Sequence, residues 1–185
     1  MLQTIFQQIP DHRRGQGRKF DLANLLLFSV LAIMSGCDSY RKIHIFIKTH
    51  LKKLKKTFGA TWKKAPGYTT IRKIIQGMNG EELEKAFRKY SKMLILLEQK
   101  KNEVLRIGFD GKVLRGSFDH FHDEKAVQIL SAFVTNSEII LAHKEIKGGE
   151  KTNEIPKVQE LIQELGVTGC VFTGDAMHCQ KKLLK

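Results

Sequence analysis

Apolar residues in the first hundred positions recur at three- and four-residue steps, which is the spacing of an amphipathic helix. Within 38–59 they fall at Ile43, Phe46, Ile47, Leu51 and Leu54. This spacing, with a turn at Pro66-Gly67, predicts helices over 22–35, 38–59, 69–75 and 79–99. We expect Asp21 to cap the first helix, Gly36 to end it, and Thr69 or Thr70 to cap the third.

The period of the apolar pattern changes after Lys100. It predicts strands over 104–109, 126–135, 138–146 and 169–174, with a helix over 153–165. The second and third strands flank an Asn-Ser turn and form a hairpin. The fold class is therefore α+β overall. An N-terminal helical domain occupies 1–100, and an α/β domain with a mixed sheet occupies 104–185.

An acid follows the first and the last of the four predicted strands, at Asp110 and Asp175. The simplest sheet pairs this hairpin with the first strand. The crossover through the helix then places the last strand parallel to the first, on its other side, so that both acids lie at one edge of the sheet. Two carboxylates at such an edge suit Mg²⁺, and two ions about 3.5–4 Å apart can clamp the oxygens of a phosphoryl transfer. The alternative is structural, because Asp110-Gly111 is also a common turn dipeptide.

The excess positive charge lies entirely in the helical half. Residues 1–104 hold 21 Lys and Arg against 8 Asp and Glu, a net charge of +13, whereas 105–185 hold 11 of each. Such asymmetry indicates a basic module that meets a polyanion, with nucleic acid favoured over an anionic membrane surface. Three cysteines argue against a disulfide framework. The apolar run 22–34 is short for a membrane span, so we expect no membrane association and a cytoplasmic chain.

Basic residues on two of the predicted helices are candidates for phosphate contacts. The first group is Lys52, Lys53, Lys55 and Lys56. The second is Arg72 and Lys73, on a short helix that could act as a recognition helix. Each group could instead be an ordinary solvated helix face, and the concentration of charge in this half favours DNA.

Three separated blocks of the second half, "IGFDGKVLRGS", "GGEKTNEIP" and "VFTGDAMHCQKK", resemble the ISAs1 group of IS4-like DDE transposases, which includes the H-repeat-associated proteins. The N-terminal "IPDHRRGQGRKFDLANLLLFSVLAIMSGCDSYRKI" and "PGYTTIRKII" resemble the helical domain of that group. The resemblance implies an incomplete ribonuclease-H-like domain over 104–185. It also implies that Asp110 and Asp175 are the first two acids of the DDE triad, which hold two Mg²⁺ or Mn²⁺ ions.

The same blocks contain other polar candidates. Lys112 and Arg115 could contact DNA near the scissile bond, or could be solvated residues of a strand or loop. Lys151 and Asn153 match a family block and begin a helix, where backbone N–H groups could meet a phosphate and Asn153 could simply cap. The family's third acid is a glutamate further downstream, and no residue of this sequence is assigned to it.

These observations lead us to expect a C-terminally truncated insertion-sequence transposase that is inactive as this chain. Its family reaction would be metal-dependent DNA strand cleavage and transfer. Its partners would be the terminal inverted repeats and target DNA, with a homodimer left open, and a bacterial cytoplasmic, nucleoid-associated location is implied. The alternative is a non-catalytic DNA-binding fragment that occupies transposon ends or represses the full-length enzyme.

Overall fold

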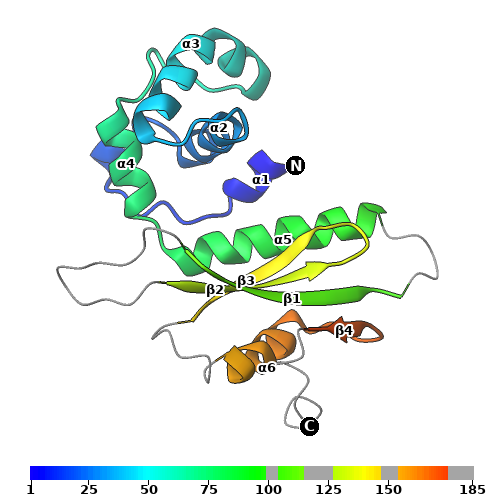
Figure 1. The fold of residues 1–185 in the computed structure, drawn as a ribbon. Helices are drawn as coiled ribbons and strands as arrows, with labels where there is room; N and C mark the ends of the chain where they lie inside the picture. Colours follow the sequence, from blue (N-terminus) through cyan, green and yellow to red (C-terminus); the bar gives the residue numbers. More distant parts are fainter. Residues whose placement is uncertain (99–103, 115–126, 147–153, 175–185) are drawn as a thin grey trace, which may run out of the picture. The chain divides into compact units, whose positions relative to one another are not determined.

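The protein divides into two compact units, unit 1 over residues 1–86 and unit 2 over residues 87–185 (Figure 1). The computed structural model describes residues 1–98, 104–114, 127–146 and 154–174. Unit 1 contains α1 (Leu2–Phe6), a 3-10 turn at Gly15–Gly17, α2 (Leu22–Met34), α3 (Tyr40–Phe58), α4 (Tyr68–Gln76) and the start of α5 (Gly80–Glu98). Unit 2 contains the rest of α5, β1 (Arg106–Val113), β2 (Gln128–Val134), β3 (Ile140–Ile146), α6 (Glu154–Leu165) and β4 (Val171–Thr173).

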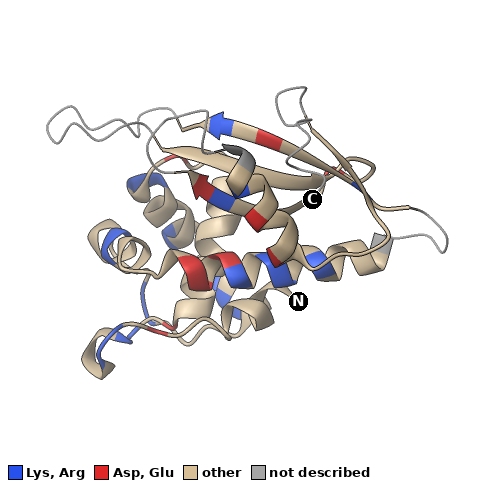
Figure 2. Cartoon of the chain, turned by 90° about the horizontal axis from the view of Figure 1, so that it is seen from below, with Lys and Arg blue, Asp and Glu red and all other residues tan. Residues whose placement is uncertain are grey.

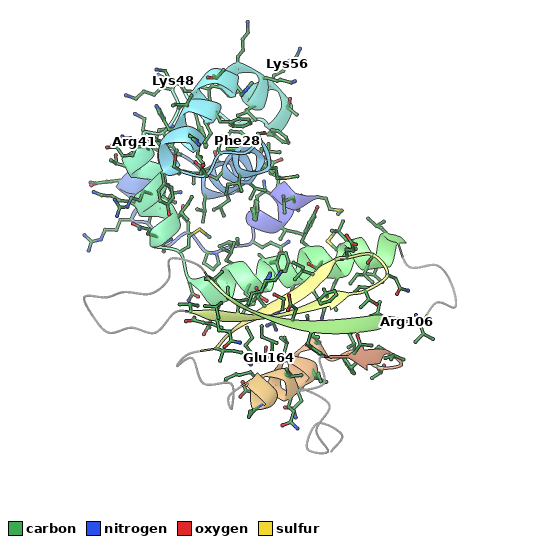
Figure 3. All side chains as sticks on the ribbon, in the orientation of Figure 1. Phe28, Arg41, Lys48, Lys56, Arg106 and Glu164 are labelled. Atoms are coloured by element: carbon green, nitrogen blue, oxygen red, sulfur yellow. The ribbon has the colours of Figure 1, made fainter. Side chains whose placement is uncertain are left out.

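Helix α2 is the centre of unit 1. Every residue from Leu22 to Ser29 is buried, as expected of a helix that is apolar all round. Asp21 is its N-cap and accepts a hydrogen bond from the backbone N–H of Asn24, which confirms the predicted cap. Phe28 lies inside the bundle, with its ring centroid 5.1 Å from that of Trp62 and 5.8 Å from that of Phe58 (Figure 3).

The two helices that follow are amphipathic and have defined ends. Ser39 caps α3 by accepting a hydrogen bond from Lys42, and Gly59 ends it with φ 73°, a left-handed conformation that glycine adopts without strain. The expected cap of α4 at Thr69 or Thr70 is wrong. Its N-cap is Gly67, because the extended Pro66-Gly67 entry starts the helix at Tyr68.

Unit 2 is built on a four-stranded mixed sheet in the order β3-β2-β1-β4. Strand β1 pairs antiparallel with β2 and parallel with β4, while β2 and β3 form the hairpin. The predicted strand order and the crossover through one helix are therefore confirmed. The predicted end of the first strand is wrong, because β1 continues through Asp110 to Val113, paired with β2 down to Gln128.

The two faces of the sheet carry different side chains, because neighbouring residues of a strand point to opposite sides. One face of the sheet packs against α6, and the side chains between them form the buried core of unit 2. They include Ile107, Phe109, Leu130 and Ala132 from the sheet and Val158, Leu161 and Leu165 from α6. The part of α5 that begins at Phe87 lies on the other face (Figure 1). There the Phe87 ring meets that of His143 at 5.0 Å, and Ser91 is fully buried.

The boundary between the two units falls within α5, after Ala86. The reason is the contact of Phe87 and Arg88 with β3. Arg88 donates to the backbone carbonyl of His143 at 3.3 Å and pairs with Glu164 of α6 at 3.0 Å. Among the described helices, none is both long and apolar enough to cross a membrane.

Strand β3 and α6 are joined by a cluster of charges around Lys144. Its ammonium, on a side chain only 18% exposed, pairs with Glu160 at 2.8 Å and with Glu164. Burial lowers the pKa of Lys144, but the hydrogen bonds to both glutamates outweigh it and raise that pKa. Hydrogen bonds from Lys144 and Lys157 lower the pKa of Glu160 to about 2, and the pKa of Glu164 is lowered by the same Lys144.

We predict that this cluster makes the stability of unit 2 sensitive to acid. A carboxyl whose pKa is lower in the folded state than its unfolded value of 4.5 stabilises the fold fully above pH 4.5. This stabilisation is lost as the pH falls towards about 2. We expect the urea concentration at the midpoint of unfolding, measured between pH 6 and pH 2.5, to decrease once the pH is below 4.5. In Lys144→Met this decrease of the midpoint with pH should be smaller. An equally steep fall in Lys144→Met would contradict this assignment.

Candidate functional site

Asp110 lies within β1, opposite Ser131 of β2, with its side chain 52% exposed. Its neighbour Phe109 is buried, so the alternation of the strand places the carboxylate on the face away from the apolar core. The ammonium of Lys112 lies 3.4 Å from the carboxylate of Asp110 and is 80% exposed. An exposed pair of this kind contributes about 0–1 kcal/mol, so the carboxylate remains available to another cation.

The second predicted acid, Asp175, lies outside the described residues, as do Arg115, Lys151 and Asn153. The strand that leads to Asp175 is described, and β4 pairs in parallel with β1 through Gly108 and Thr173. Asp110 follows Gly108 by two positions, and Asp175 follows Thr173 by two positions. Over the described part of the chain, no three His, Cys, Asp or Glu side chains gather as a complete metal site would need.

The predicted lysines of α3 lie on the solvent side of that helix. Lys52, Lys53 and Lys56 are exposed and Lys55 is half-buried, whereas Ile43, Ile47 and Leu54 face the core. Lys48 and Lys56 project from the outer side of α3 in Figure 3. Figure 2 marks in blue where Lys and Arg lie along the chain, and in red where Asp and Glu lie. The sixteen Lys and Arg of residues 1–86, against six Asp and Glu, leave unit 1 a net charge of +10.

Helix α4 exposes Arg72 and Lys73 and buries Ile71 and Ile74. Its first turn is fixed against the beginning of α3. The Arg41 guanidinium lies 5.2 Å from the centre of the Tyr68 ring, and His44 Nδ1 lies 2.7 Å from the carbonyl oxygen of Pro66. The predicted group of α3 lysines begins at Lys52, eleven residues after Arg41 and about 16 Å along the helix at 1.5 Å per residue. The two predicted basic groups therefore occupy different parts of unit 1.

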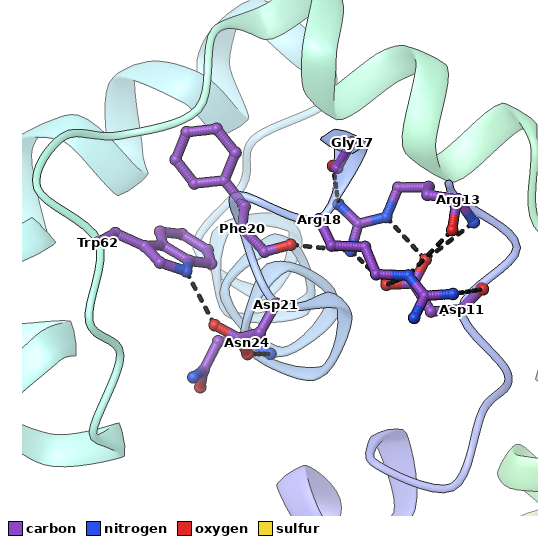
Figure 4. Close-up of polar contacts among 8 residues, drawn as sticks. All are labelled: Asp11, Arg13, Gly17, Arg18, Phe20, Asp21, Asn24 and Trp62. Carbon is purple, nitrogen blue, oxygen red and sulfur yellow. Dashed lines mark hydrogen bonds and ion pairs between the residues drawn. The ribbon is translucent and has the colours of Figure 1, made fainter. Parts of the chain in front are cut away.

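The loop of residues 11–20 contains a polar network that the sequence patterns did not reveal (Figure 4). Arg13 donates from Nε and Nη2 to the two carboxylate oxygens of Asp11, at 2.8 and 2.7 Å. It also donates to the carbonyls of Gly17 and Phe20, at 3.1 and 2.8 Å. Arg18 donates to the carbonyls of Arg13 and Asp11. The acid and base two positions apart, before a Gly-x-Gly turn, were the only signals of this network in the sequence.

The end of this loop is anchored to the aromatic core. Asp21 caps α2 with one carboxylate oxygen, and its other oxygen accepts a hydrogen bond from the Trp62 indole N–H at 2.8 Å. Phe20 packs edge-on against Trp62, with ring centroids 5.2 Å apart. Hydrogen bonding from Arg13 is the main cause of the lowered pKa of Asp11, and it outweighs the opposing effect of burial. The carboxylate of Asp11 is therefore ionised, and the guanidinium of Arg13 balances its charge.

Comparison with known families and proteins gives a consistent result. A family model described as "DDE_Tnp_1-associated" matches residues 3–91. "Putative transposase YncI" of Escherichia coli (strain K12) is 32% identical over 94% of this chain and 67% of its own length. "H repeat-associated putative transposase YhhI" and "Putative protein YbfL" of the same strain are each 31% identical over 95% of this chain. The chain spans 44% of the length of these last two relatives.

The approach of β1 to β2 beside Asp110 depends on Gly108. A Cβ atom on Gly108 would lie 2.7 Å from Phe133 Cζ, because the aromatic ring crosses directly over the glycine. We predict that Gly108→Ala destabilises unit 2 by about 1–3 kcal/mol, since the ring must move from a packed position. Urea unfolding measures this destabilisation.

The double variant Gly108→Ala/Phe133→Leu should be destabilised by less than the sum of the two single variants. Gly80→Ala is the control, because nothing lies within 4 Å of a Cβ at that position. Additive effects in the double variant would show that the Phe133 ring is not the obstacle.

Proposed function

The chain belongs to a transposase family, the one that includes YncI and YhhI, and from this premise we propose that it acts in DNA transposition. In this proposal unit 1 binds DNA. The neighbouring strands β1 and β4 of unit 2 belong to a ribonuclease-H-like DDE centre for strand cleavage and transfer. The observation that carries the proposal is the parallel pairing of β1 and β4, in which Gly108 lies opposite Thr173 and an acid follows each of these two residues by two positions in the sequence.

The proposed catalytic acids are Asp110 and Asp175. Asp110 supplies an exposed carboxylate, the type of oxygen ligand that Mg²⁺ and Mn²⁺ take in proteins, so the donor present fits these ions. When bound, such ions supply Lewis-acid chemistry at a phosphodiester. We propose that Lys112, which pairs with Asp110, also contacts a phosphate next to it. We propose similar phosphate contacts for Arg115, Lys151 and Asn153.

In unit 1 we propose two DNA contacts, one along α3 and one at α4. Lys52, Lys53, Lys55 and Lys56 would contact the backbone of the duplex, and Arg72 and Lys73 would approach it from α4. The support is the exposure of all but Lys55 and the net charge of +10 in a unit whose acids are largely engaged in caps and ion pairs. The partner DNA would include terminal inverted repeats and target sites.

A second candidate is a non-catalytic role, in which the 185-residue chain occupies DNA ends and represses the full-length enzyme. It is favoured by the compactness of unit 1 and by the net charge of +10 in that unit. In both candidates we propose that this polypeptide alone does not cleave DNA. Mn²⁺-dependent cleavage by the purified chain, abolished by Asp110→Ala, would overturn that part of the proposal.

We predict that the chain binds duplex DNA with a strong dependence on salt. Removal of one phosphate contact should reduce the slope of log K against log [salt] by about 0.9. Lys52→Ala/Lys53→Ala/Lys56→Ala should therefore reduce it by about 2.7, measured by fluorescence anisotropy with a labelled duplex. Lys85→Ala/Lys92→Ala removes charge from α5 and serves as the control. Binding that does not change between about 50 and 200 mM salt would contradict a DNA-binding role.

We also predict that Asp110 contributes to binding of divalent metal. Titration calorimetry with Mn²⁺ should show affinity reduced about tenfold or more in Asp110→Asn and in Asp175→Asn, because each removes a charged ligand. Glu145→Gln removes an exposed acid from β3 and is the control. Equal Mn²⁺ affinity in the wild type and both Asp variants would argue against the metal centre, while leaving DNA binding untouched.

A further inference from the structure

The loop of residues 11–20 is held in one conformation although its sequence, DHRRGQGRKF, contains two glycines and no apolar residue before Phe20. Ordering a backbone costs about 1–2 kcal/mol per residue, so a loop of this composition needs specific contacts to stay ordered. Here the contacts come from Arg13, whose side chain is only 8% exposed. Its guanidinium binds both oxygens of Asp11 and two backbone carbonyls, which closes the loop on itself.

This arrangement separates the charges of the loop into two groups. Asp11 and Arg13 neutralise each other inside it. Arg14 and Lys19 are exposed, and among the described residues the side chain of neither takes part in a hydrogen bond or ion pair. Arg18 donates to the carbonyls of Arg13 and Asp11, lies 3.7 Å from the Asp11 carboxylate, and remains 54% exposed. The loop therefore presents three cations on a rigid frame.

The same loop lies beside α4. A Cβ atom on Gly77, which follows the last residue of α4, would lie 2.8 Å from Nε2 of His12, so the histidine ring packs against the end of that helix. Lys73 is one helical turn before Gly77, and its carbonyl accepts the hydrogen bond of the Gly77 N–H. Basic residues of the loop and of α4 thus belong to neighbouring parts of one unit.

We propose that the loop of residues 11–20 is a preorganised contact for the phosphate backbone of duplex DNA, through Arg14 and Lys19, next to the contact made by α4. The inference rests on the proposed DNA-binding function and adds a site to it. Phosphate oxygens suit these cations, and a loop already ordered loses little further entropy on binding. Arg13 and Asp11 are positioning residues, because they hold the loop and leave the contact to their neighbours.

The first experiment compares two double variants of the full chain that remove equal charge. Arg14→Ala/Lys19→Ala should weaken binding of a labelled duplex about tenfold or more at about 0.1 M salt and reduce the salt slope by about 1.8. Lys85→Ala/Lys92→Ala should leave the slope within experimental error. Equal effects of the two double variants would overturn the proposal, because only total charge would then matter.

The second experiment separates loop geometry from charge. Asp11→Asn raises the net charge by one, so charge alone would strengthen binding to DNA. The substitution also replaces the carboxylate whose two oxygens accept hydrogen bonds from Arg13, and so releases the loop. Our proposal therefore expects weaker binding to DNA. Circular dichroism and a cooperative thermal transition would confirm that the variant is folded. Tighter binding by folded Asp11→Asn would overturn the proposed role of the frame.

The two proposals fail in different ways. If the wild-type chain shows no salt-dependent binding to any duplex, the DNA-binding function itself is wrong and the loop site is wrong with it. If the wild type binds, the α3 triple variant weakens binding, and Arg14→Ala/Lys19→Ala does not, only the loop site is wrong. Weaker binding in both sets of variants supports both sites.

Discussion

The structure of unit 2 depends on one constraint, which is that β1 must pair with different partners on its two sides. Its backbone groups meet an antiparallel strand on one side and a parallel strand on the other. A strand in that position can bury Ile107 and Phe109 towards α6 while presenting the alternate residues to the opposite face. The exposure of Asp110 and the close approach of Phe133 over Gly108 both follow from this pairing.

Unit 1 is organised by a small set of polar contacts around an aromatic core. Trp62 packs on Phe20 and Phe28 and donates its one N–H to Asp21. The same carboxylate starts α2, so one residue connects the core, the helix and the end of the preceding loop. Because an unpaired buried indole N–H or an uncapped helix would each cost free energy, these contacts depend on one another.

The sequence was sufficient for features that depend on local chemistry and periodicity. The positions of α2 to α6 and the cap at Asp21 could be predicted from spacing and from a single residue type, and the order of the strands from a crossover through one helix. Helix α1 was not predicted. The length of β1 could not, because its continuation through Asp110-Gly111 depends on pairing with Ser131 and Leu130 of another strand. A dipeptide typical of turns becomes part of a strand when a partner is available.

In the candidate site, too, some features could be predicted from the sequence and others could not. Exposure of Arg72, Lys73 and most of the α3 lysines could be predicted from helical periodicity. The role of Arg13 could not be predicted, because two of its four acceptors are backbone carbonyls that only the folded loop brings near.

The Arg88 contact with the carbonyl of His143 has a consequence for how this sheet can grow. An edge strand with free backbone groups is a template for another chain, and a charged side chain bound there obstructs such addition. Glu164 holds the same guanidinium from α6, so the obstruction is fixed in place. In the described sheet the opposite edge is β4, a short strand with Val171 and Phe172 partly exposed. The β3 edge is therefore obstructed at His143 by a side chain that both the sheet and α6 hold in place.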